Sequence, residues 1–291
     1  MDKINFYLPD FYDKYELNIL VCDTLRMYPE YFYDNIKIGA VYGCFPNSIW
    51  NGGRVVLGGA VKEEIEYIIE DFNGRGIPIR YTFTNPLLEK KHLYDTFCNL
   101  CLEAADNGKN EIIINSPLLE AYIRKHYPDY KFISSTTKCL ESIDMVEEEL
   151  KKDYALIVLD NSFNNAEKTF KLPEKERYEL VVNSYCRDKC PNRVKHYEEI
   201  ARAQLEFRSS QFPSCPFINL PKEKQMQKHG FITKEQVYGK YKEAGFCHFK
   251  IDGRAFDNRK VMESYLYYLV KPEYYDFVKN AWYQAMDKLC E

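Results

Sequence analysis

Short apolar runs alternate with longer segments of helical periodicity along most of the chain. Eight of these runs have the length and the β-branched composition of buried strands. They are residues 4–8, 36–43, 77–84, 111–115, 131–135, 155–160, 178–182 and 247–252. Segment 61–76 shows the intervening pattern, because its apolar residues fall on one face of a helix and the sequence NGRG then ends that helix. Those apolar residues are Ile65, Ile68, Ile69 and Phe72.

Strands that alternate with helices predict parallel βαβ units, and a (β/α)8 barrel, regular or distorted, is their natural closed form. The length of 291 residues suits one such domain, and no repeat or low-complexity linker divides the chain. We therefore expect a single domain over residues 1–291. The interval 183–246 is too long for one loop and one helix, which predicts an insertion there, and 259–291 is expected to form a C-terminal helical segment.

Polar residues follow most of the predicted strands. In a (β/α)8 barrel the C-terminal ends of the strands form the working face. A single Asn, Asp or Ser in this position commonly caps the next helix, but the complete ring favours a site at this end. The ring consists of Asn85, Asn115, Ser116, residues 134–137, Asp160, Asn161, Asn183, Ser184, Asp252 and Arg254.

The loop 43–54 is long and ends in two glycines followed by Arg54. Gly52 and Gly53 permit a tight turn or a close approach of the backbone to a ligand. The loop has no phosphate-binding motif. It either covers the mouth of the barrel or contributes to binding.

Cysteines are concentrated late in the chain. Cys186 and Cys190 follow the seventh strand in a basic loop, Cys215 lies in the insertion, and Cys247 begins the eighth strand. Four thiolates could converge on the barrel end and hold a [4Fe–4S] cluster, whose negative charge the basic residues would offset. Their spacing matches neither ferredoxins nor zinc ribbons, so zinc ligation and buried free thiols remain alternatives.

Other candidate groups have plainer interpretations. Cys98 and Cys101 form a CxxC on one helix face, which favours core packing. His196 and His248 are nearest the predicted cluster and serve either proton transfer or structure. The aromatic segment 263–284 resembles a base-stacking surface, but its helical spacing favours packing.

Overall charge does not favour nucleic acid or anionic membranes as partners, although a local basic patch is compatible with it. The formal net charge of −4, from 40 basic and 44 acidic side chains, provides no general attraction to nucleic acid or anionic membranes. The N-terminus does not resemble a signal peptide, and no apolar run is long enough to span a membrane. Ten cysteines without a secretion signal predict a cytoplasmic protein with reduced thiols.

Four segments are similar to motifs of the bacterial collagenase-like peptidase family, whose relatives include oxygen-independent hydroxylases. These segments are FKIDGR (249–254), YELVVNSYC (178–186), NSPLLEAYIRKHYPDYKFISST (115–136) and IGAVYGCFPNSIWNGGR (38–54). The resemblance covers roughly residues 36–270, in order. The chain departs from the family where Tyr178, Leu180 and Asn183 replace an acidic residue, a phenylalanine and a glycine, and where Asp252 replaces a glutamate. The gap between the first two cysteines is also shorter than usual.

The resemblance implies an iron–sulfur enzyme with a [4Fe–4S] cluster held by Cys186, Cys190, Cys215 and Cys247. Its activity would be oxygen-independent hydroxylation, or a related redox modification, of a small aromatic or base-like substrate. Two alternatives remain: a non-catalytic iron–sulfur subunit that binds a protein partner or electron donor, and a peptidase. For the peptidase no nucleophile–base pair is visible in the sequence.

Strand-end position assigns roles to seven further residues. We expect Asp160 and Asp252 to be the catalytic carboxylates that handle protons. Arg54, Lys250 and Arg254 would bind an anionic donor or substrate by charge-assisted hydrogen bonds. The remaining candidates for substrate binding are Asn85 and Asn115.

Overall fold

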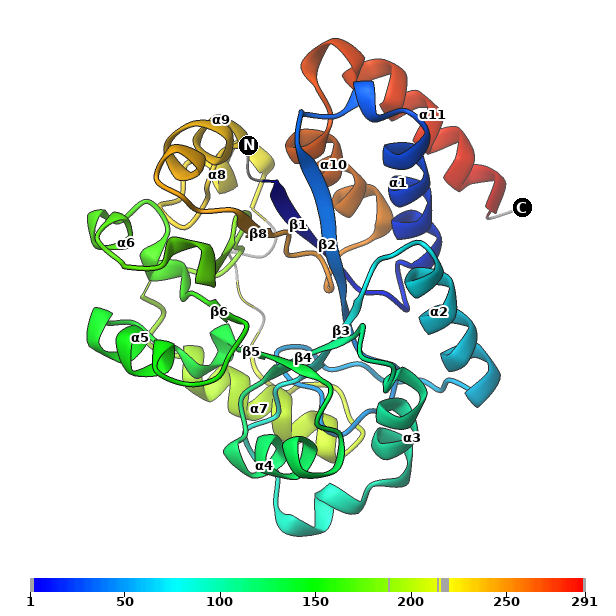
Figure 1. The fold of residues 1–291 in the computed structure, drawn as a ribbon, viewed down its shortest axis with the longest axis vertical. Helices are drawn as coiled ribbons and strands as arrows, with labels where there is room; N and C mark the ends of the chain where they lie inside the picture. The colour runs from blue at the N-terminus through cyan, green and yellow to red at the C-terminus, as the bar shows by residue number, and fades with distance from the viewer. Residues whose placement is uncertain (1–2, 188, 214, 216–219, 290–291) are drawn as a thin grey trace.

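Eight parallel strands close into a barrel in which each strand pairs with its neighbours in chain order, β1 to β8 (Figure 1). The structure, a computed structural model, describes residues 3–187, 189–213, 215 and 220–289. The strands are β1 (Ile4–Pro9), β2 (Ile36–Gly43), β3 (Ile79–Phe83), β4 (Glu111–Ile114), β5 (Lys131–Ser134), β6 (Leu156–Val158), β7 (Tyr178–Val181) and β8 (His248–Lys250). The predicted (β/α)8 barrel is confirmed, and each predicted strand is present.

Helices surround the ring of strands on the outside (Figure 1). They are α1 (Tyr15–Met27), α2 (Lys62–Gly74), α3 (Thr96–Ala105), α4 (Pro117–His126), α5 (Ile143–Leu150), α6 (Glu167–Phe170), α7 (Arg193–Leu205), α8 (Lys222–Met226), α9 (Lys234–Gln236), α10 (Asn258–Leu269) and α11 (Tyr275–Leu289). Three of them, α7, α8 and α9, lie in the interval between β7 and β8, followed by a π-helix over Val237–Tyr241.

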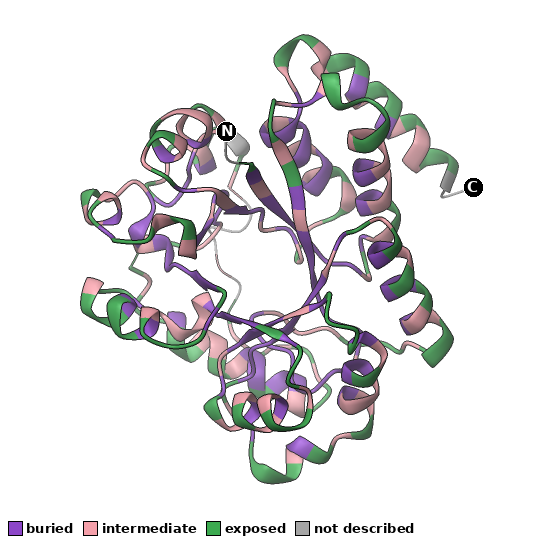
Figure 2. Ribbon diagram, in the orientation of Figure 1, coloured by how far each residue is buried: buried purple, intermediate pink, exposed green. Residues whose placement is uncertain are grey.

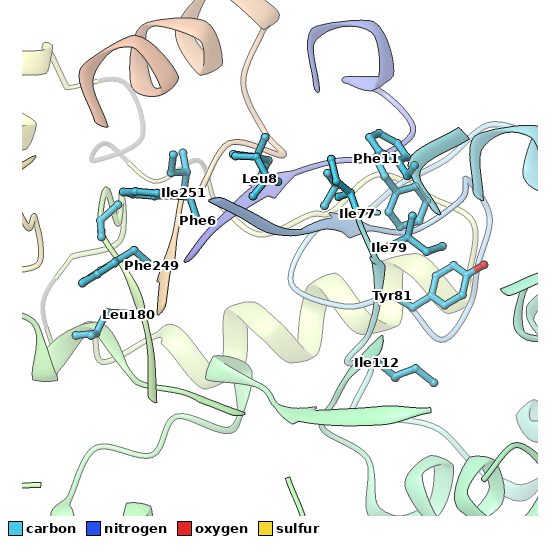
Figure 3. Packing of buried hydrophobic residues seen from close by; sticks show 14 of the residues in the cluster. Phe6, Leu8, Phe11, Ile77, Ile79, Tyr81, Ile112, Leu180, Phe249 and Ile251 are labelled. Atoms are coloured by element: carbon cyan, nitrogen blue, oxygen red, sulfur yellow. The ribbon is translucent and has the colours of Figure 1, made fainter. Parts of the chain in front are cut away.

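Side chains along the strands alternate between two environments, as the two-residue period of a strand requires. Those that point outward form the main hydrophobic core between strands and helices, including Phe6, Leu8 and Leu180 (Figure 3). Figure 2 shows that the strands are buried while the outer faces of the helices are exposed. Tyr7 and Ile113 belong instead to a smaller apolar cluster on the inner face of the barrel.

Charged residues share the inner face with this small cluster. Arg80 and Glu179 are fully buried and form an ion pair across the barrel. Arg80 Nε also donates to Glu111 Oε2 at 2.7 Å, and its guanidinium lies 4.0 Å above the ring of Tyr7. The Tyr7 hydroxyl is hydrogen-bonded to His248 Nδ1 at 2.6 Å. These residues form a polar network inside the barrel, below the C-terminal ends of the strands. Its charged side chains are paired with one another.

The aromatic C-terminal segment packs, as its spacing predicts. Tyr265 and Tyr268 of α10 are buried, and their hydroxyls donate to Asn18 Oδ1 and the Ile232 carbonyl. Cys98 and Cys101 are also fully buried in α3, which confirms core packing for the CxxC. Among the described residues, no helix combines the length and apolar character needed to cross a membrane.

Candidate active site

A pocket opens at the C-terminal ends of the strands, where the barrel architecture predicts a working face. It has about 690 Å³ of empty space, part of which is open to solvent. The lining residues are Tyr42, Gly53, Arg54, Thr82, Thr84, Ile113, Ser135, Thr136, Thr137, Asn161, Val181, Ser184, Cys186, Arg193, Tyr197, Lys250, Asp252 and Arg254. Five predicted site residues thus meet in one place: Arg54, Cys186, Lys250, Asp252 and Arg254.

Arg254 lies on one wall of the pocket with only neutral acceptors as partners. Its guanidinium donates to Asn51 Oδ1 at 3.2 Å, Thr82 Oγ1 at 3.0 Å and the Gly52 carbonyl at 3.1 Å. It forms no ion pair within 4.0 Å with any carboxylate of the described residues. A charge in a partly enclosed site is costly without a counter-charge, so this guanidinium is suited to an anionic ligand.

The glycines of the loop 43–54 bring the loop backbone to Arg254. A Cβ on Gly52 would lie 2.6 Å from the carbonyl carbon and oxygen of Thr84, so only glycine fits there. Gly53 has φ +74° and lies against the guanidinium of Arg254. Trp50 anchors the loop, because it is buried and its indole N–H donates to the His92 carbonyl at 2.7 Å. The loop is therefore part of the pocket wall.

Arg54 and Asp252 face each other across the pocket. Arg54 Nη2 lies 3.4 Å from Asp252 Oδ2, and both side chains are less than one quarter exposed. The Asp252 backbone is fixed by Asn183, whose side chain donates to the Asp252 carbonyl at 2.8 Å and accepts from its N–H at 2.6 Å. The backbone of Asp252 is therefore held in place, and its carboxylate lines the pocket beside Arg54.

Asp160 has a different role from the one predicted. Its Oδ2 forms an ion pair with Arg193, and its Oδ1 accepts from the N–H of Ser162 at 2.8 Å. Asn161 also binds the Arg193 guanidinium. Because both of its oxygens are engaged, Asp160 positions Arg193, the first residue of α7, at the pocket.

Lys250 extends from β8 to the floor of the pocket. Its Nζ lies 3.6 Å from Glu179 Oε1 and 3.8 Å from the centroid of the Tyr42 ring. Burial lowers the pKa of Lys250 to about 8, although the carboxylate of Glu179 opposes this effect. For Glu179, burial alone would raise the pKa, but Arg80 and Lys250 lower it below its ordinary value. Lys250 thus connects the paired network of the lower barrel to the pocket.

Cys186 is the one predicted cysteine that lines the pocket. Its carbonyl accepts from Lys228 Nζ at 2.6 Å, which ties the loop after β7 to α8 and the segment that follows it. Burial raises the pKa of the Cys186 thiol, although Arg193 and Arg54 oppose this. The thiol is therefore protonated at neutral pH in this environment.

The four predicted cluster ligands are not brought together. Cys247 precedes β8, and its carbonyl accepts from the N–H of Asn5 at the beginning of the barrel. Since a strand rises about 3.3 Å per residue, Cys247 lies roughly 16 Å before Asp252, at the opposite end of the barrel from Cys186. Among the described residues, Cys190 and Cys215 included, no three Cys, His, Asp or Glu side chains could hold one metal ion. This arrangement does not fit a [4Fe–4S] centre on these four residues.

Asn85 and Asn115 lie outside the pocket. Asn85 is buried, and its amide donates to the carbonyls of Ile49 and Ala201, so it supports the wall. Asn115 donates to Thr137 Oγ1 at 2.8 Å and lines a neighbouring groove formed with α4, α5 and α7. Thr137 and Tyr197 line both the groove and the pocket, so the two are adjacent.

His196 and His248, the two histidines nearest the predicted cluster, both contact aromatic side chains of the protein. His248 begins β8 and binds Tyr7, away from the pocket, and burial lowers its pKa to about 4. The ring of His196 stacks on that of Phe212 with centroids 4.5 Å apart. Neither histidine lines the pocket.

Sequence reasoning missed several residues that organise the site. Asn51 is fully buried, donates to the Arg54 carbonyl at 2.7 Å and accepts from Thr82 and Arg254. Arg193 follows the cysteine loop, where its basic charge alone does not distinguish it from its neighbours. Tyr42 forms part of the floor, and its hydroxyl donates to the Ile251 carbonyl at 2.7 Å. Asn51 could have been identified from the sequence, because it directly precedes the two glycines of the loop.

Comparisons with known proteins support the fold. No family model and no curated protein matches the sequence. Among solved structures, the chain is similar to one described as the U32 peptidase Mk0906, with a TM-score of 0.51 and 15% sequence identity. The similarity covers 87% of this chain and 94% of that one. At this identity the likeness shows a shared fold, and that fold is found in the collagenase-like family that the sequence motifs resemble.

Proposed function

We propose that the protein is an enzyme that binds a small anionic substrate in the pocket at the C-terminal end of the barrel. The carboxylate or phosphate group of the substrate binds between Arg254 and Arg54, and Asp252 exchanges a proton with the reacting atom. The observation that carries this proposal is the guanidinium of Arg254, which faces the pocket and whose hydrogen bonds within the described part of the chain go to neutral oxygens.

The charge balance of the pocket supports an anionic ligand. Among the residues that the structure describes, the lining contains four cationic side chains and one carboxylate, that of Asp252. The cationic residues are Arg54, Arg193, Lys250 and Arg254. Arg193 is paired with Asp160 and Lys250 lies beside Glu179, whereas Arg254 has no such partner among the described residues. A ligand carboxylate would complete this set, and hydroxyls such as those of Thr82 and Ser135 would bind its polar groups.

The predicted hydroxylation gains no support from this arrangement. It depends on four cysteines acting as ligands of one cluster, and the barrel separates Cys247 from Cys186. Proton transfer by Asp252 requires no such cluster. Asn183 fixes the backbone of Asp252, and the Asp252 carboxylate, which lies beside Arg54, can accept a proton from a bound substrate and return it.

Calorimetric titration with small probe molecules tests the proposal. Succinate and inorganic phosphate are expected to bind, whereas the neutral succinamide is not, because only the anions complement Arg254. Replacement of Arg254 by Ala should weaken succinate binding by at least about tenfold, since a charged hydrogen bond contributes about 1.5–3 kcal/mol.

The matched control is Arg26→Ala. Arg26 is exposed on α1 and pairs only with Asp23, so its removal should leave succinate affinity unchanged. Equal affinity for succinate and succinamide would contradict the proposal. So would an Arg254→Ala protein that binds succinate as tightly as the unaltered protein.

A second candidate function is peptide hydrolysis, which the groove beside the pocket favours. The groove meets the pocket at Thr137 and Tyr197 and could accommodate a chain whose terminal carboxylate binds Arg254. In the same titration, an acetylated tetrapeptide with a free C-terminus should then bind more tightly than succinate, and its amidated form should not bind. Mass analysis of the recovered peptide would show whether it is cleaved.

A further inference from the structure

The fold places the amine of Lys250 in the pocket, close to other side chains but beyond hydrogen-bonding distance of them. Lys250 is the one lysine of the described part of the chain that lines the pocket, and it is only 8% exposed. The Nζ atom forms no hydrogen bond with any residue that the structure describes. Its neighbours are the Glu179 carboxylate at 3.6 Å and the face of the Tyr42 ring at 3.8 Å. The amine is therefore open to a molecule bound above it.

Lys138 shows what an engaged lysine looks like in this protein. It is partly buried at the rim of the adjacent groove, and its Nζ binds Glu149 and the hydroxyl of Tyr154. Burial lowers the pKa of this lysine too. The difference between the two lysines is geometric, because the Lys138 amine already donates to two acceptors whereas that of Lys250 faces open space.

The charged groups around Lys250 come from three strands or their ends. Glu179 of β7 and Asp252 after β8 favour the ammonium form, whereas Arg80 of β3 and Arg254 disfavour it. Burial is the largest influence, and the pKa falls to about 8. About a tenth of the molecules then carry the neutral, nucleophilic amine at neutral pH, against less than about a thousandth for an exposed lysine.

We infer that Lys250 forms an imine with the carbonyl carbon of a 2-oxo acid whose carboxylate binds Arg254. This rests on the proposed function, because the same pocket and the same guanidinium hold the anionic group. Both cations border the ring of Tyr42, Lys250 Nζ at 3.8 Å and Arg254 Cζ at 5.9 Å from its centroid. In a 2-oxo acid the carboxylate is bonded directly to the carbonyl carbon. Such a molecule can therefore place its carboxylate at Arg254 and its carbonyl carbon at Lys250, since both residues border the ring of Tyr42.

The chemistry is balanced without an oxidant or reductant. The neutral amine attacks the carbonyl carbon, the nitrogen gives up one of its two hydrogens as a proton, and the carbonyl oxygen takes up a proton to form a carbinolamine. The nitrogen then loses its remaining hydrogen as the hydroxyl leaves as water, and a C=N bond replaces the C=O bond. Asp252, which lines the same pocket, can deliver and accept the protons.

Borohydride trapping tests the inference. The full-length protein is incubated with pyruvate and sodium borohydride, which reduces an imine to a stable secondary amine, and the modified lysine is located by peptide mass mapping. Lys250 should carry the adduct, and lactate, which has the carboxylate but not the ketone, should slow its formation. The initial rate should rise between about pH 6 and about pH 9, as the amine of Lys250 loses its proton.

Two variants and one binding measurement separate the possible failures. Lys250→Met should lose the adduct, while Lys138→Met should retain it and bind succinate within about threefold of the unaltered protein. Adducts spread over exposed lysines, or none at Lys250 in a protein that binds succinate, would overturn the inference and leave the proposed function standing. Absence of binding by succinate and phosphate alike would overturn both.

Discussion

The barrel contains two polar layers that differ in how their arginines are paired. The lower layer is the buried network of Arg80, Glu111 and Glu179, and the upper layer is the pocket lining with Arg254. In the lower layer, Arg80 lies between Glu179 and Glu111 and is fully buried. In the upper layer, Arg254 faces the pocket and contacts neutral oxygens. The lower charges are matched within the chain, whereas the upper charge forms no ion pair with any residue that the structure describes.

The difference shows how a barrel separates stability from binding. An ion pair that is fully enclosed becomes costly when one member is lost, because the other remains as a buried charge. A cation at the pocket wall can exchange water for a ligand, so its removal affects binding more than folding. Lys250 lies at the boundary, with Glu179 below it and the open pocket above it.

The largest expected effect is on the lower layer. Glu179→Gln leaves Arg80 with Glu111 alone, and the free energy of unfolding should fall by about 3–5 kcal/mol in urea denaturation. The control is Glu66→Gln in the exposed pair with Lys62, which should cost less than about 0.5 kcal/mol. If the two variants lose the same stability, the charges of the lower layer do not hold the barrel together.

The next effect is a pH dependence from the same layer. Burial lowers the pKa of His248 from 6.5 to about 4, although Glu179 opposes this. Between these values the unfolded chain binds more protons at this residue than the folded chain does, so His248 makes the protein less stable as pH falls through that window, by up to about 3 kcal/mol. Chemical denaturation at several pH values should therefore show a shallower loss for His248→Gln than for the unaltered protein. Parallel curves would contradict this.

A smaller effect is expected at the upper layer. Gly52→Ala places a Cβ against Thr84 and should cost about 1–3 kcal/mol by overpacking, and it should also weaken succinate binding because the Gly52 carbonyl holds Arg254. Gly74→Ala at the end of α2 is the matched control, since a Cβ added there would meet no atom within 4 Å and alanine suits a helix. A neutral Gly52→Ala would show that the loop can move away from β3.

Much of the fold could be predicted because each strand is recognisable from its own short run of apolar residues. Runs such as residues 111–115 are apolar on both faces, and the structure buries both faces. The lower layer was missed because Arg80 and Glu179 each stand singly within an otherwise apolar run, where a charged residue resembles a surface position. Their pairing across the barrel joins β3 to β7 and has no trace in either segment.

The site was predicted in part for the same reason. Arg54, Lys250, Asp252 and Arg254 meet because strand-end position is a property of topology, which the alternation of elements reveals. The prediction that Cys247 lies at the pocket was wrong. The sequence already placed this residue at the beginning of a strand, and strand beginnings lie at the end of the barrel away from the pocket. Asn85 and Asp160 follow strands too, but what their side chains contact depends on residues remote in the chain.

The most direct measurement of the unmatched charge at the upper layer is a crystal structure of the protein soaked in bromide, with anomalous data collected at the bromine edge. We expect a bromide ion in contact with the guanidinium of Arg254 inside the pocket, and none beside Arg80. A pocket without bromide, in a crystal whose exposed arginines and lysines have bound it, would contradict the account.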